Sequence, residues 1–362
     1  MNDKTGEEFG QKLDYQREFW KLAWEELYRQ IDDVTRRADD QIKQAQEHLL
    51  GYQKYCITEQ MQAFDEYVRY TETHPPMSTG FKQLDEVLGG GLYEGLYAIG
   101  AVSSLGKTAF TLQIADQAAE QGHSAIIFSL EMSKFELIAR SVSRFSARMD
   151  TSSGTTFAKS ARGIMDGKKR LSYTHDEKAL IAKAQQRYTQ VADKRIYIWE
   201  SDDDISLSMV HDTIETHIRH TGQRPLVIVD YLQILPHPVT SGYGTLSDKQ
   251  AVDRNVTLLK RMSRKFHIPL LVVSSFNRGS YKNGAVMEAY KESGTIEYTA
   301  DVLISLQYRG ATTDETLAQA RRKMPREIEA VILKNRNAQS WGEVGFRYNP
   351  ALNLFTEEVR KA

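Results

Sequence analysis

The chain has 362 residues and a formal net charge of -1, and 41% of its residues are hydrophobic while 26% are charged. These totals are typical of a water-soluble chain with room for one large domain and a smaller one, and the near-zero charge neither requires nor excludes nucleic acid. A single cysteine, Cys56, excludes an intramolecular disulfide framework. No apolar run is long enough to span a bilayer, and the N-terminus has no signal-peptide layout, so we expect a cytoplasmic protein without membrane contact.

The first 75 residues are predicted to be helical. Residues 9 to 70 contain no proline and many Glu, Gln, Lys and Arg. Apolar residues recur there with a seven-residue rhythm, which is typical of a coiled coil or a helical hairpin. Two interpretations stay open: an arm for oligomerisation or partner binding, and a helix packed on its own domain. The seam positions are Leu13, Trp20, Leu27 and Val34, with Trp24, Ile31, Ala38 and Ala45.

A domain boundary is predicted near residue 75. Gly51 interrupts the first helical pattern, and a second amphipathic pattern from Ile57 to Val68 ends before His74, which two prolines follow. We therefore expect a helical arm over residues 1–75 and a second domain over residues 76–362.

Strands and helices alternate in the second domain. Such alternation predicts an α/β fold with a largely parallel sheet, whose ligands bind at the carboxyl ends of the strands. The C-terminal residues 341–358 predict a hairpin. The expected strands are 96–99, 125–128, 195–199, 226–230, 269–274, 302–306 and 328–333, and the expected helices include 81–88, 109–121 and 251–266.

A phosphate-binding loop is predicted where the sequence reads GLYAIGAVSSLGKT, at residues 95 to 108. An apolar strand, a loop of small residues and a helix that begins at Gly-Lys-Thr provide the structural context that such a loop requires. Lys107 would contact the β and γ phosphates of ATP, and the Thr108 hydroxyl would bind Mg²⁺. The usual first glycine is replaced by Ala101. The expected nucleotide-binding residues are Ala101, Ser103, Ser104, Leu105, Gly106, Lys107, Thr108 and Ala109.

Two acidic residues follow other predicted strands. Asp230 ends the most apolar strand, and Glu131 lies just beyond residues 125–128. Cleavage of a phosphoanhydride requires positioning and charge neutralisation. Asp230 would therefore help to hold Mg²⁺, and Glu131 would orient or deprotonate the attacking water.

Other polar residues are interpreted more simply. We expect His211, His217 and His220 to form a solvated helix face and not a metal site, because no cysteine or carboxylate cluster accompanies them. The segment from Lys260 to Lys265 is expected to form the outer face of a helix.

The second domain resembles the RecA-like motor domain of the DnaB-type replicative DNA helicases of superfamily four. The motifs that carry this resemblance occur in the family's order, from about Ser78 to the C-terminus. They are TGFKQLD, LGGGL, AVSSLGKT, FSLEMS at 128–133, VDYLQIL at 229–235, SSFNR at 274–278, ESGTIEYTADV at 292–302 and KNRN at 334–337. The resemblance implies a ring, usually a hexamer, that hydrolyses ATP while it translocates on single-stranded DNA.

The resemblance also implies roles for further residues. Lys334 and Arg336 match the family's cations that reach the nucleotide of the neighbouring subunit. Ser275, Asn277 and Arg278 match its sensor run. Loops 236–254 and 279–290 match the segments that line the central channel, with Lys249, Arg254 and Lys282 for phosphate contact and Tyr243 and Tyr281 for stacking.

The sequence departs from the family pattern in several places. Ser275 replaces the usual glutamine, which would sense the γ-phosphate, so coupling between hydrolysis and DNA binding is expected to differ. Residues 1–75 do not match the family's larger primase-contacting domain, which puts partnership with a primase in doubt. Such variants resemble those of mobile elements, so a replication or mobile-element partner would bind residues 1–75.

Three functions fit this sequence. The first, which we favour, is an ATP-driven translocase or helicase on single-stranded DNA. The second is a RecA-like ATPase of recombination or regulation, which would form filaments on DNA and not rings. The third is a nucleotide-dependent assembly or loading factor without unwinding activity, in which the helical arm is the working part.

Overall fold

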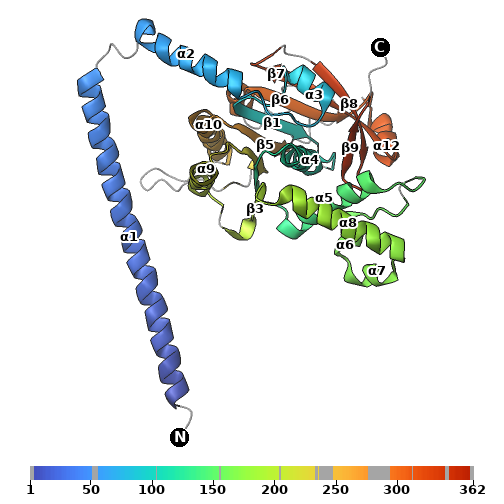
Figure 1. Ribbon diagram of the computed structural model, residues 1–362, viewed down its shortest axis with the longest axis horizontal. Helices are drawn as coiled ribbons and strands as arrows, with labels where there is room; N and C mark the ends of the chain where they lie inside the picture. Colours follow the sequence, from blue (N-terminus) through green and yellow to red (C-terminus); the bar gives the residue numbers. More distant parts are fainter. Residues whose placement is uncertain are drawn as a thin grey trace. The chain divides into compact units, whose positions relative to one another are not determined.

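The computed structural model describes residues 4–50, 56–102, 104–154, 156–203, 205–232, 235, 248–275, 294–311, 313–338 and 342–358 (Figure 1). The chain divides into two compact units, Met1–Pro75 and Pro76–Ala362. The first unit contains helix α1 (Lys4–Leu50) and helix α2 (Ile57–Thr73).

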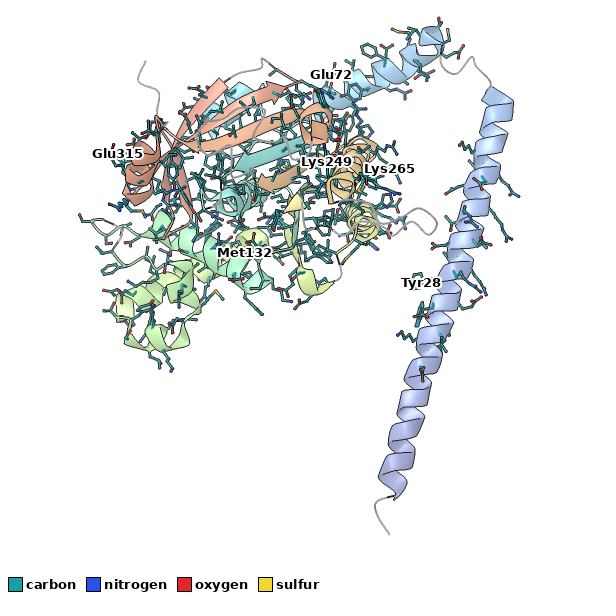
Figure 2. The ribbon with its side chains drawn as sticks, turned by 180° about the vertical axis from the view of Figure 1, so that it is seen from behind. Tyr28, Glu72, Met132, Lys249, Lys265 and Glu315 are labelled. Atoms are coloured by element: carbon teal, nitrogen blue, oxygen red, sulfur yellow. The ribbon has the colours of Figure 1, made fainter. Side chains whose placement is uncertain are left out.

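Helix α1 is stabilised locally and exposes an apolar stripe. At 1.5 Å per residue its 47 residues extend for about 70 Å. Arg29 pairs with Glu26 at 2.6 Å, and Arg37 pairs with Asp33 at 2.6 Å, so the polar face is lined with ion pairs one turn apart. The large apolar side chains from Trp24 to Ile42 are solvent-exposed, and Tyr28 projects from the helix in Figure 2.

The second unit alternates strands and helices, as the sequence predicts. Its elements are α3 (Lys82–Leu88), β1 (Gly95–Ala101), α4 (Lys107–Glu120), β2 (Ala125–Ser129), α5 (Lys134–Met149), α6 (Ala161–Met165), α7 (Gly167–Ser172), α8 (His175–Ala192), β3 (Ile196–Glu200), the 3-10 helix η2 (Ser201–Asp203), α9 (Leu207–Thr221), β4 (Leu226–Asp230), α10 (Asp248–Phe266), β5 (Pro269–Ser275), α11 (Gly294–Thr299), β6 (Val302–Tyr308), α12 (Asp314–Arg322), β7 (Arg326–Asn335), β8 (Gly342–Asn349) and β9 (Leu354–Glu357).

Among the described residues, nine strands form one sheet in the order β3-β2-β4-β5-β1-β6-β7-β8-β9. The strands from β3 to β6 in this order pair in parallel. Strands β7, β8 and β9 extend the sheet with antiparallel pairs, and β8 and β9 form the predicted C-terminal hairpin. The predicted α/β fold with a largely parallel sheet is confirmed.

The central strands are buried on both faces because helices cover each side (Figure 1). Along β1, Tyr97 and Ile99 belong to a core with α3 and α4, whereas Leu96 and Ala98 belong to a second core with α9 and α10. This alternation explains the near-continuous apolar runs in the sequence. None of the described helices combines the length and the apolar composition that a bilayer crossing requires.

Arg144 is the largest fully buried side chain of the described residues. Its guanidinium forms an ion pair with Asp116 of α4 and donates to the carbonyl oxygen of Asn353 at 2.8 Å. The pair joins the helix after the phosphate-binding loop to α5 and to the turn between β8 and β9. A charge buried this deeply is stable only because it is paired.

The prediction that all three histidines of α9 lie on a solvated face was wrong for His217. His217 is 8% exposed, and its Nε2 lies 2.8 Å from the hydroxyl oxygen of Ser124. The sequence pattern misled because α9 packs this position against the segment that precedes β2. Within the described part of the chain, no three His, Cys, Asp or Glu side chains gather in a way that could hold a metal ion.

Acidification is expected to destabilise the fold through His217. Burial lowers the pKa of His217 below its usual value of about 6.5. His217 therefore binds a proton more readily in the unfolded chain than in the folded chain. As a consequence, the free energy of unfolding falls as the pH drops from 7 towards 5, by less than about 1.4 kcal/mol per pH unit. Urea titrations at several pH values should show a shallower pH dependence for His217→Gln. The exposed His220 gives the matched control, His220→Gln, which should keep the wild-type slope; an unchanged slope in His217→Gln would contradict the assignment.

Candidate nucleotide site

The loop between β1 and α4 has the backbone geometry of an anion site. Ser104 and Gly106 both have positive φ angles, 67° and 93°. Gly106 is the N-cap of α4, and no side chain caps this helix end in the described structure. The first amide of α4 with an intrahelical acceptor is that of Phe110, which donates to Gly106. The preceding amides of α4 therefore point into the loop together with the positive end of the helix dipole.

Residues from the antiparallel strands support this loop from outside. Arg326 Nη1, at the start of β7, donates to the carbonyl oxygen of Ser104 at 2.8 Å. The ring of Tyr348, on β8, lies against Gly106 so closely that a Cβ atom there would lie 2.7 Å from ring carbons. Leu105 is buried and anchors the loop on the core. Glycine is thus required at position 106 both for its φ angle and for space.

Lys107 is the first residue of α4, directly after the loop. Its Nζ donates to the carbonyl oxygen of Ala101 at 3.0 Å, so the ammonium folds back over the loop. Burial lowers the pKa of Lys107, while the carboxylates of Asp230 and Glu131 act in the opposite direction. The ammonium is therefore only partly hydrated and lies in the field of both acids.

Asp230 and Glu131 lie at the same edge of the sheet as the loop, because β1, β2 and β4 run parallel. Asp230 is the register partner of Ser129, and its carbonyl oxygen accepts the amide of Leu130 at 2.7 Å, which places Glu131 beside the end of β4. Asp230 is 5% exposed. Burial raises the pKa of Asp230, and a hydrogen bond with the Thr108 side chain lowers it.

The donor set fits Mg²⁺. The Thr108 hydroxyl, which helps to lower the pKa of Asp230, and the Asp230 carboxylate supply hard oxygen ligands, the type that Mg²⁺ prefers. A buried carboxylate is stable when it is paired with a cation, so Asp230 and Thr108 would hold Mg²⁺ here.

Lys334 and Arg336 lie at the opposite edge of the sheet. The backbone amide of Asp301 donates to Leu96, and that of Arg336 donates to Asp301, so Arg336 lies near the beginning of β1. Leu96 and Ala101 are five residues apart along β1, about 17 Å at 3.3 Å per residue. The Arg336 side chain is 46% exposed. These two cations are thus remote from the nucleotide loop of their own chain.

The remaining predicted site residues have different outcomes. Ser275 ends β5 as the register partner of Ala101, next to the nucleotide loop. Lys249 and Arg254 are exposed but lie in the first turns of α10, so their predicted position in a loop was wrong; Figure 2 labels Lys249 there. Several predicted residues lie outside the described residues, namely Ser103, Asn277, Arg278 and Lys282, with Tyr243 and Tyr281.

The sequence did not reveal several residues that organise the two edges. Arg326 and Tyr348 support the loop from more than 200 residues away, and no local pattern marks them. Lys260 was predicted on an outer helix face, but it is 9% exposed and pairs with Asp301, so that prediction was wrong. The apolar residues Leu259 and Ile268, which flank the eight residues 260–267, are a signal that this part of α10 is partly covered.

Comparisons with known proteins identify the family of the second domain. The family model described as DnaB-like helicase C terminal domain matches residues 76–357. The replicative DNA helicase DnaB of Leifsonia xyli subsp. xyli is 29% identical over 269 residues, which cover 72% of this chain and 51% of the relative. DnaB of Geobacillus stearothermophilus is 29% identical over 294 residues, 76% of this chain and 56% of the relative. The chain thus spans about half the length of these relatives.

Solved structures show the same fold. The structure of a separate ATPase domain superposes with a TM-score of 0.68 at 21% identity, over 83% of this chain and 99% of that domain. A DnaB-like replicative helicase, whose structure was reported with its interactions with primase, gives a TM-score of 0.66 at 20% identity, over 88% of this chain and 75% of that protein.

Proposed function

Because the chain belongs to the family of DnaB-like helicase C-terminal domains, we propose that it is an ATP-driven DNA helicase that acts in replication and hydrolyses ATP between its subunits. One observation carries the proposal. The phosphate loop and the buried Asp230 lie at one edge of the sheet, while Lys334 and Arg336 lie at the opposite edge, near the beginning of β1, which supports a role for these cations at the nucleotide of a second subunit.

Each residue of the nucleotide edge has a task in the proposed reaction. The α4 amides and Lys107 would hold the phosphates of ATP, and Thr108 and Asp230 would hold Mg²⁺, which would supply charge neutralisation at the phosphates. Glu131, beside the end of β4, orients the attacking water and accepts its proton. Ser275, the register partner of Ala101, would take the position of the sensor, and its short side chain would alter the coupling between hydrolysis and DNA binding.

The cations act in the neighbouring subunit. A guanidinium supplied by another chain stabilises the charge of the transition state and typically accelerates hydrolysis by about 10³ to 10⁵. We assign this role to Arg336, with Lys334 beside it. Hydrolysis then requires a homo-oligomer, and a head-to-tail interface that closes on itself gives a ring, for which we propose six subunits.

Single-stranded DNA is the proposed track. Lys249 and Arg254 project from the first turns of α10 and would contact phosphates, as would Lys282. The helical arm, with its exposed stripe from Trp24 to Ile42, would bind either other copies of the chain or a replication or mobile-element partner. A cytoplasmic location is part of this proposal.

The proposal is tested by ATPase and unwinding assays. Phosphate release should rise at least about tenfold when single-stranded DNA is added, and a forked duplex should be separated only when ATP and Mg²⁺ are both present. Lys249→Ala/Arg254→Ala should lose this stimulation while it keeps the DNA-independent rate. Double-stranded DNA serves as the control ligand. Absence of both stimulation and strand separation would reject the helicase and favour an assembly factor, and filaments on DNA in negative-stain images would favour a recombination ATPase.

A further inference from the structure

Asp301 lies at the centre of a buried polar network at the edge opposite the phosphate loop. It is 6% exposed, and both of its carboxylate oxygens are engaged. Oδ2 accepts the backbone amide of Leu96 at 2.8 Å and pairs with Lys260 of α10. Oδ1 lies 3.4 Å from Nη1 of Arg336.

Arg336 is held from a second direction by the end of α11. Its Nη2 donates to the carbonyl oxygen of Tyr298 at 2.9 Å. Lys334 Nζ donates to the carbonyl oxygens of Glu297 and Tyr298 at 2.7 and 3.1 Å. These carbonyls belong to the last turn of a helix, where intrahelical donors are missing, so they readily accept external cations.

Only Asp301 gives Arg336 a charged anchor among the described contacts. A long, half-exposed arginine samples many rotamers unless it is tethered, and the carboxylate limits this sampling on one side while Tyr298 limits it on the other. The carboxylate is itself fixed by the Leu96 amide and by Lys260, so the anchor is rigid. Contacts of this kind hold the Arg336 guanidinium in one orientation before it meets a ligand, which is the preorganisation that a catalytic cation requires.

We propose that Asp301 is a positioning residue that presents Arg336 to the nucleotide of the neighbouring subunit, and that Lys260 holds the Asp301 carboxylate in place. Asp301 touches neither nucleotide nor reacting atoms in this assignment. The inference rests on the proposed shared site. The competing explanation is that the Lys260 and Asp301 pair only fastens α10 to the sheet.

The experiment measures ATP turnover of Asp301→Asn alone and in equimolar mixtures with other variants. Asparagine keeps the acceptor for the Leu96 amide but loses the charge. We expect kcat to fall about 10²-fold with KM for ATP changed less than about twofold, because a misplaced catalytic group affects the chemical step and the nucleotide cradle is untouched.

Mixed oligomers separate the two explanations. An active site requires an intact phosphate loop from one subunit and an intact, correctly held Arg336 from the next. Asp301→Asn keeps the first and Lys107→Ala keeps the second. An equimolar mixture should therefore recover up to about a quarter of wild-type turnover, because the head-to-tail interface brings the two intact halves together. Asp301→Asn mixed with Arg336→Ala should recover nothing, since both variants fail on the cation side. Recovery in this second mixture would overturn the positioning role.

A reference mixture distinguishes the failure of the inference from that of the proposed function. Lys107→Ala mixed with Arg336→Ala must itself recover turnover. If it does not, the shared site is rejected and the Asp301 assignment falls with it. If it does, the result of the Asp301→Asn mixtures decides the Asp301 assignment alone.

Two further variants test whether the effect of Asp301→Asn is only a folding defect. Lys260→Met/Asp301→Asn removes both buried charges, so the fold should be retained while Arg336 still loses its anchor. It should melt close to the wild type and behave like Asp301→Asn in every mixture. Glu94→Gln removes a carboxylate that pairs with His267 next to the start of β1, and it should keep wild-type kcat. Wild-type turnover in the well-folded double variant would also overturn the proposal.

Discussion

Replacement of Lys107 by alanine is expected to lower ATP turnover about 10²- to 10³-fold, the size of effect seen when a preorganised donor to a developing anion is removed. The ammonium lies over the phosphate loop, 3.0 Å from the Ala101 carbonyl oxygen, and faces both acids of the site. Among the described residues, Arg326 also donates to the loop, but it does so from β7 to the carbonyl oxygen of Ser104 and does not face the two acids. Phosphate release measures turnover, and binding of a fluorescent ATP analogue measures nucleotide affinity separately.

Lys168 offers the matched control for Lys107. It is exposed on α7, away from the loop, so Lys168→Ala should keep wild-type turnover and nucleotide affinity. A Lys107→Ala protein that retains more than about a tenth of wild-type turnover would contradict the assignment of the phosphate loop.

Replacement of Arg336 by alanine is expected to leave ATP affinity within about twofold of the wild type and to reduce turnover about 10³-fold or more. Its guanidinium lies near the beginning of β1, whereas the phosphate loop follows the end of that strand. The phosphate loop of the Arg336→Ala chain therefore remains intact. Equimolar mixtures with Lys107→Ala should regain activity, because each variant supplies what the other lacks.

Arg336→Lys refines this result. Lysine keeps the charge but lacks the planar fork of a guanidinium, so its turnover should lie between those of the wild type and Arg336→Ala. Undiminished turnover in Arg336→Ala would reject the role in the neighbouring site. A loss of nucleotide affinity equal to the loss of turnover would instead indicate that Arg336 supports the fold of its own chain.

The local patterns predicted the elements of the second domain well. Continuous apolar runs located the buried parallel strands, and Leu226–Asp230 begins and ends as expected. The phosphate loop was also predicted from sequence, since such a loop needs only a strand, small residues and a helix start in succession, and the structure has β1 and the start of α4 at those positions. Asp230 and Glu131 could be placed at one edge because the carboxyl ends of parallel strands must coincide.

Predictions about charged side chains on helices were less accurate. Lys260 and His217 were assigned to solvated faces, yet both are buried. A basic or imidazole side chain looks the same in sequence whether it meets water or a partner on another element. Its burial is decided by Asp301 in one case and by Ser124 in the other, each remote in the chain.

The sequence by itself determined the order of strands and helices, the phosphate loop and the acids beyond the strand ends, because these depend on neighbouring residues and on strand direction. Only the tertiary structure decided that Tyr348 and Arg326 support the loop and that Asp301 holds Arg336 at the far edge. The physical reason is that these contacts join residues from distant strands, which only the pairing of the sheet brings together.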